Sequence, residues 1–124
     1  MSARPPLALL AIDADAGRLR QALVLARAEI ALGGTARLFA QGESVMLFRL
    51  PLVLEEDERW EAVGEPALAD LIDEALNDGV AIGLCQTSAA MMDLTPGSFH
   101  PAVEFAGPIG FLAGVEAHHR LLVI

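Results

Sequence analysis

The chain has 124 residues, of which 54% are hydrophobic, and a formal net charge of −9 at pH 7. It contains no lysine, and its eight cations are scattered arginines, so it lacks the basic footprint that binds nucleic-acid phosphates. The longest apolar run covers residues 7–12, far short of the roughly 20 residues of a membrane-spanning helix. No signal-peptide pattern follows the N-terminus. We therefore expect no nucleic-acid partner, no membrane, and one domain over residues 1–124.

Cys85 is the only cysteine. A single thiol excludes an internal disulfide and a cysteine-based zinc site, so the cytoplasm is the expected compartment. The hydrophobic content is high for a domain of this size. Because monomers rarely leave large apolar patches in water, we expect a homo-oligomer whose interface covers the excess.

Apolar segments alternate with helical patterns from the N-terminus onward. Residues 7–12 form a continuous apolar run, which is typical of a strand covered on both faces. Asp13 or Asp15 can then cap a helix, which Gly33-Gly34 ends. Residues 35–40 are the second predicted strand.

The segment between residues 41 and 65 is the least regular part of the chain. Residues 44–48 are expected to form a short helix, and the acidic run at residues 55–58 is expected to be a solvated loop. Pro66 is well placed as the first residue of the next helix, which closes at Asn77-Asp78-Gly79.

Residues 80–84 form the third predicted strand, which runs directly into Cys85. Thr87 or Ser88 is expected to cap a short helix through about residue 94, with Met91 and Met92 as core side chains. Residues 103–106 and 121–124 are the fourth and fifth strands. Strands with helices between them imply right-handed crossovers. The predicted fold is therefore α/β, with three α/β/α layers around a five-stranded parallel sheet.

Ligands of parallel α/β sheets bind outside the carboxyl ends of the strands. The polar residues expected at that edge are Asp13, Asp15, Gln41, Glu43, Ser44, Cys85, Gln86, Thr87 and Ser88. Asp13, Asp15 and the three residues after Cys85 are first of all expected to be helix caps.

The histidines are expected at the other end of the sheet. His100 precedes the fourth strand, and His118-His119 precede the fifth. A Cys–His dyad within one subunit is therefore not expected, and only a histidine from a neighbouring subunit could reach the thiol. Two adjacent histidines alone do not supply converging ligands, so no metal site is predicted.

Two interpretations of Cys85 remain open. Most free cysteines are small buried hydrophobes. However, free backbone N–H groups at a helix start stabilise a thiolate, and Cys85 stands where a predicted strand meets a predicted helix. A thiolate in that position can accept a sulfur atom or attack a disulfide.

Three segments resemble the DsrE/DsrF-like family. Residues 80–88, Val-Ala-Ile-Gly-Leu-Cys-Gln-Thr-Ser, preceded by Asn77-Asp78-Gly79, resemble its active-site segment. Residues 32–43, Leu-Gly-Gly-Thr-Ala-Arg-Leu-Phe-Ala-Gln-Gly-Glu, are similar to its second strand and following loop, and residues 103–107 to its fourth strand. The resemblance implies a parallel five-stranded sheet and homo-oligomers, commonly dimers, trimers or hexamers. It also implies cytoplasmic sulfur trafficking, in which the cysteine that matches Cys85 carries persulfide sulfur.

The expected function is that of a small cytoplasmic sulfur carrier or sulfurtransferase-like protein with Cys85 as the persulfide-bearing thiol. A sulfur donor or acceptor protein is the expected partner, and neither a cofactor nor a metal is expected. The expected pocket around the anion comprises Asp13, Gln41, Glu43, Gln86, Thr87 and Ser88. The stretch after Cys85 lacks the basic residues of some sulfur-transferring members. The alternatives are a non-catalytic homo-oligomeric binding or regulatory module and, more weakly, a thiol peroxidase that needs an external thiol.

Overall fold

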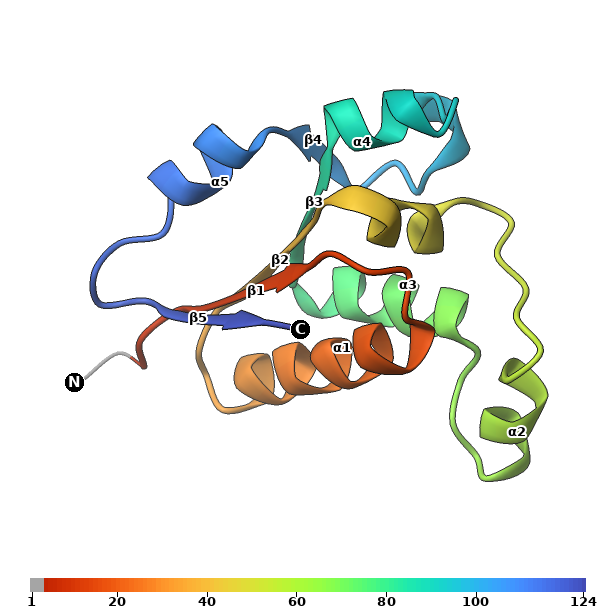
Figure 1. Cartoon of the computed structure of the whole chain (residues 1–124). Helices are drawn as coiled ribbons and strands as arrows, with labels where there is room; N and C mark the ends of the chain where they lie inside the picture. Colours follow the sequence, from red (N-terminus) through yellow and green to blue (C-terminus); the bar gives the residue numbers. More distant parts are fainter. Residues whose placement is uncertain (1–3) are drawn as a thin grey trace.

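The computed structural model describes residues 4–124. Its strands form one parallel five-stranded sheet in the order β4-β3-β2-β1-β5, which confirms the predicted fold class (Figure 1). The strands are β1 (Leu7–Ala11), β2 (Ala36–Ala40), β3 (Ala81–Cys85), β4 (Glu104–Ala106) and β5 (Arg120–Val123). Each lies within two residues of its predicted bounds.

Two helices cover one face of the sheet. They are α1 (Ala16–Ala31) and α3 (Leu68–Asp78), which lie side by side below the strands in Figure 1. Side chains of successive strand residues point to opposite faces, and the strand register places Leu9, Leu38 and Ile82 on the face toward α1 and α3. All three are almost completely buried, so the main core lies between the sheet and these helices. Within residues 4–124, no helix is long and apolar enough to cross a membrane.

The opposite face carries the short helix α5 (Pro108–Ala113). The Phe39 ring stacks on the Phe111 ring, with centroids 4.9 Å apart. Beside them, an Arg37 Nη donates a hydrogen bond of 2.8 Å to the Phe111 carbonyl oxygen. This helix covers only part of the face, since Leu121 and Val123 of the edge strand β5 remain 41% and 61% exposed.

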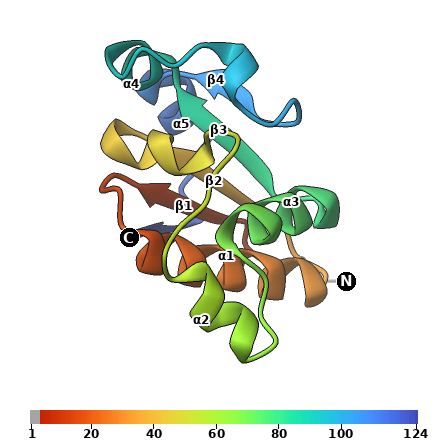
Figure 2. The ribbon, with the colours of Figure 1, turned by 90° about the vertical axis from the view of Figure 1, so that its right-hand side faces the viewer.

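Residues 42–67 leave the sheet. The 3₁₀ helix η1 (Gly42–Phe48) lies beyond the end of β2, and α2 (Asp57–Ala62) stands apart from the sheet in two perpendicular views (Figures 1 and 2). This excursion is tied to α1: the Arg20 guanidinium lies 4.3 Å from the centroid of the Trp60 ring. Arg20 also donates a 2.7 Å hydrogen bond to the Pro66 carbonyl.

Several local predictions are wrong. The acidic run is not only a solvated loop, because Asp57 is buried and its carboxylate accepts hydrogen bonds from the backbone N–H groups of Leu54 and Leu68. Pro66 does not begin the helix, since α3 starts at Leu68. Met91 is 81% exposed and is not a core residue, because the helix that carries it lies at the rim of the sheet (Figure 2).

Candidate functional site

Cys85 joins two elements. It is the last residue of β3, where it pairs with Ala106 of β4, and it is also the N-cap of α4 (Gln86–Met91). Neither Thr87 nor Ser88 caps this helix, contrary to the prediction, because the helix begins directly after Cys85 and both residues lie inside it. With six residues, α4 is shorter than two full turns, so its dipole is a weak source of thiolate stabilisation.

The Cys85 side chain is covered. Its residue is 3% exposed, and η1 and α4 pack against each other beyond the ends of β2 and β3. The backbone N–H of Gly42 donates a 2.8 Å hydrogen bond to the Ser88 hydroxyl, which links the two helices. Gly42 has a φ of 64°, a left-handed conformation that glycine adopts without strain.

Ser44 connects the same loop to β1. It is completely buried, and its hydroxyl donates a 2.9 Å hydrogen bond to the Ala11 carbonyl. Its backbone N–H donates to the Ile12 carbonyl, also at 2.9 Å. The carboxyl ends of β1, β2 and β3 are therefore bound together by the first turn of η1 and by Ser88.

The other residues expected at this edge are more exposed to solvent than Cys85 and Ser44. Asp13, Glu43, Gln86 and Thr87 are exposed, and Gln41 is half-buried. Asp15 is the N-cap of α1, and its carboxylate accepts a 3.0 Å hydrogen bond from the Arg18 N–H. The capping prediction is thus confirmed for Asp15, while the side chains of Ser44 and Ser88 form hydrogen bonds with distant segments of the chain.

A cavity of about 170 Å³ lies on the α5 face of the sheet. Arg37, Phe39, Gly83, Glu104 and Phe111 are among its lining residues. The Arg37 Nε is buried without a hydrogen-bond partner among the described residues. The only sequence signal for this feature is an arginine in an otherwise apolar strand.

Two of the three histidines lie at the opposite end of the sheet from Cys85. His118 and His119 occupy the turn before β5, at the amino end of that strand as predicted. The His100 Nε2 lies 2.9 Å from the Asp73 carboxylate in the middle of α3. Sequence reasoning missed Glu116, whose carboxylate lies with the ligand atoms of His118 and His119 within 4.8 Å of one another.

No family model and no curated protein matches the chain. Solved structures do match it. The ychN protein from E. coli superposes with a TM-score of 0.76 at 15% sequence identity, over 98% of this chain and 100% of that one. The protein of unknown function MTH1491 from Methanobacterium thermoautotrophicum gives a TM-score of 0.71 at 12% identity, over 98% and 100% of the two chains.

A conserved protein of unknown function from Bacteroides thetaiotaomicron, BT1422, also matches, with a TM-score of 0.71 at 15% identity over 96% of this chain and 94% of that one. At such identities the likeness concerns the fold alone. The chain therefore shares its fold, over almost its whole length, with ychN and with two proteins of unknown function.

Proposed function

We propose that the protein is a cytoplasmic sulfur carrier or sulfurtransferase-like protein, related to the DsrE/DsrF-like family, in which Cys85 bears persulfide sulfur. The observation that carries this proposal is the place of the thiol. Cys85 ends a central strand at the carboxyl edge of a parallel sheet, where α/β proteins bind their ligands.

The chemistry is an exchange between sulfur atoms. The Cys85 thiolate attacks the outer sulfur of a donor persulfide, a new S–S bond forms, and the donor's own S–S bond breaks. The electron pair of the broken bond leaves with the donor thiolate. Attack by an acceptor thiolate on the outer sulfur then restores Cys85, so no external oxidant or reductant is consumed.

The burial of the Cys85 thiol limits its access to a protein-borne persulfide. Because Cys85 is 3% exposed, a protein-borne persulfide reaches it only through a local opening, and we propose that η1 and α4, which begin at the ends of β2 and β3, separate in that opening. The hydrogen bond from Gly42 to Ser88 holds these helices together. The carrier function therefore includes an opening at this contact.

Intact-protein mass spectrometry after incubation with a polysulfide tests the proposal. Wild-type protein should gain the mass of one or more sulfur atoms, and a reductant should remove the gain. Cys85→Ser protein is the matched control and should gain nothing. Wild-type protein that stays unloaded, under conditions that load an established persulfide carrier, would exclude the proposal.

The burial of Cys85 favours a second candidate, a non-catalytic homo-oligomeric binding or regulatory module. An enclosed thiol is an ordinary core residue, and Leu121 and Val123 leave apolar surface on an edge strand of the kind that assembly covers. Light scattering after gel filtration tests for a dimer, trimer or hexamer. Cys85→Ala protein that keeps its assembly and stability, together with wild-type protein that takes up no sulfur, would favour the module.

A further inference from the structure

The turn between α5 and β5 gathers three metal-ligating side chains. Glu116, His118 and His119 each offer one ligand atom, and these atoms all lie within 4.8 Å of one another. The His119 N–H donates a 3.0 Å hydrogen bond to the Glu116 carbonyl, which closes the turn and brings its ends together. The His118 Nδ1 lies 3.6 Å from the Glu116 carboxylate, and the two imidazole centroids are 4.6 Å apart.

We propose that this turn binds one divalent transition-metal ion of the zinc, copper and nickel class, through the Glu116 carboxylate and the imidazoles of His118 and His119. Imidazole nitrogen suits these borderline ions, whereas magnesium and calcium prefer oxygen ligands alone. Bonds of about 2.0–2.2 Å around zinc place neighbouring tetrahedral ligands roughly 3.3 Å apart. The three donors therefore need only small rotations, which side chains as exposed as Glu116 and His118, at 69% and 62%, make freely.

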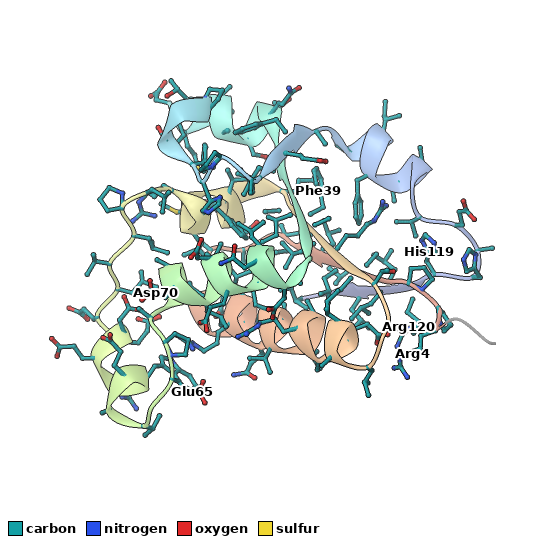
Figure 3. The ribbon with its side chains drawn as sticks, turned by 180° about the vertical axis from the view of Figure 1, so that it is seen from behind. Arg4, Phe39, Glu65, Asp70, His119 and Arg120 are labelled. Carbon is teal, nitrogen blue, oxygen red and sulfur yellow. The ribbon has the colours of Figure 1, made fainter. Side chains whose placement is uncertain are left out.

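The chain is held in place directly after the turn, where the Arg120 N–H donates a 2.9 Å hydrogen bond to the Pro6 carbonyl. Arg120, the next residue, donates hydrogen bonds to the Pro5 carbonyl and pairs with the buried carboxylate of Glu29 at 2.9 Å. Figure 3 shows Arg4, His119 and Arg120 at the same end of the molecule. The guanidinium of Arg120 is thus paired with the Glu29 carboxylate. The three ligands belong to an ordered turn, and this order lowers the entropic cost of metal binding.

One existing interaction competes with the metal. The Glu116 backbone N–H donates a 3.2 Å hydrogen bond to the His119 Nδ1. An ion that binds Nδ1 replaces this hydrogen bond, and an ion that binds Nε2 moves the ring hydrogen to Nδ1 and also removes it. In both cases the cost is a single exposed hydrogen bond.

The site is independent of the proposed sulfur chemistry. It lies at the amino end of β5, whereas Cys85 lies at the carboxyl end of the parallel strand β3. Three protein ligands leave at least one coordination position, which water or a donor group of another molecule fills.

Isothermal titration with Zn²⁺, on tag-free Cys85→Ser protein so that the thiol cannot contribute, tests the site. We expect one zinc ion per chain. His118→Ala and His119→Ala should each weaken binding by an order of magnitude or more, since even indirect contacts to a metal are worth about 10–100-fold. Glu116→Gln should weaken it by a smaller factor.

His100→Ala is the matched control, because His100 pairs with Asp73 outside the turn and its loss should leave the affinity unchanged. Circular dichroism should show the same fold for all variants. Equal zinc affinity in His118→Ala and wild-type protein, a loss of binding in His100→Ala, or binding only at millimolar zinc would each overturn the proposal.

Discussion

The carboxylate of Glu29, near the end of α1, lies 2.9 Å from the guanidinium of Arg120, the first residue of β5. Arg4 approaches the same carboxylate, with hydrogen bonds of 2.6 and 3.1 Å. The Arg4 hydrogen bond, supported by Arg120 and opposed by burial, lowers the pKa of Glu29 from 4.5 to about 2. A single acidic side chain thus joins the N-terminal segment, the first helix and an edge strand.

Glu29 should make stability depend on pH. Because its pKa is lower in the folded state, its contribution is complete above about pH 4.5 and is lost as the pH falls toward about 2. We expect Glu29→Gln to lower the Tm at pH 7 and to flatten the decline of Tm across this range. Thermal melts at a series of pH values measure both effects. Glu74→Gln, which removes an exposed carboxylate 4.0 Å from Arg27, should keep the wild-type profile, and a Glu29→Gln profile as steep as wild type would contradict the prediction.

Gly114 leaves room for Arg37. A Cβ at residue 114 would lie 2.6 Å from one Arg37 Nη and 3.0 Å from Cζ, and the guanidinium is held by its hydrogen bond to Phe111. Gly114→Ala should therefore destabilise the protein by about 1–3 kcal/mol, as overpacking does. Gly110→Ala, within α5, meets no atom within 4 Å and should stabilise by about 0.5–1 kcal/mol through helix propensity. Urea unfolding compares the two, and equal effects would contradict this role of Gly114.

Asp57 should be the important member of the acidic run. Its buried carboxylate holds the N–H groups of Leu54 and Leu68, so Asp57→Ala leaves both donors without a partner at a cost of about 1–3 kcal/mol. Glu58→Ala alters an exposed neighbour and should change the free energy of unfolding by no more than about 0.5 kcal/mol. The same urea experiment separates them. Similar losses in the two variants would contradict a specific role for Asp57.

Asp15 and Asp13 offer another matched pair. The Asp15 carboxylate accepts the Arg18 N–H at the start of α1, and loss of such a cap costs about 1 kcal/mol. Asp13 is exposed outside the helix. We expect Asp15→Ala to lower the urea midpoint and Asp13→Ala to leave it unchanged, and the reverse order would refute the assignment of the cap.

The strands were predictable because a short, continuous run of apolar residues indicates a buried strand. Residues 7–12 and 80–84 carry continuous apolar side chains, as is typical of inner strands of a parallel sheet, although Ala81 on the face of α5 stays exposed. The capping role of Asp15 was also predictable, because an N-cap side chain bonds to backbone groups only a few residues away in sequence. The order of the strands has no such local signal, and the position of β5 beside β1 emerges only from the structure.

The candidate site depends on contacts between residues far apart in sequence, which local sequence patterns do not reveal. The place of Cys85 at the end of a strand follows from the sequence, but the contact between α4 and η1 does not, because the Ser88 hydroxyl accepts its hydrogen bond from Gly42 in a loop far away in sequence. A capping role for Ser88 was the natural local interpretation of the same side chain. The role of Asp57 has no local signal for the same reason, since one of its two donors, Leu68, lies beyond the whole of α2.

Ser88 should control access to Cys85. Ser88→Ala removes the acceptor of the Gly42 N–H, and a lost hydrogen bond worth about 1 kcal/mol raises the population of the open state roughly fivefold. Alkylation of Cys85 under native conditions should accelerate by a similar factor when opening is in rapid equilibrium. Thr87→Ala, at the exposed neighbouring position, should react at the wild-type rate.

Asp15→Ala distinguishes local opening from global unfolding. This variant loses about 1 kcal/mol at the cap of α1 without altering the contact between Gly42 and Ser88. If Cys85 reacts through separation of η1 and α4, Asp15→Ala protein should be alkylated at the wild-type rate. If Asp15→Ala accelerates alkylation as much as Ser88→Ala does, the thiol reacts only in the unfolded chain, and the opening on which the carrier function depends does not occur.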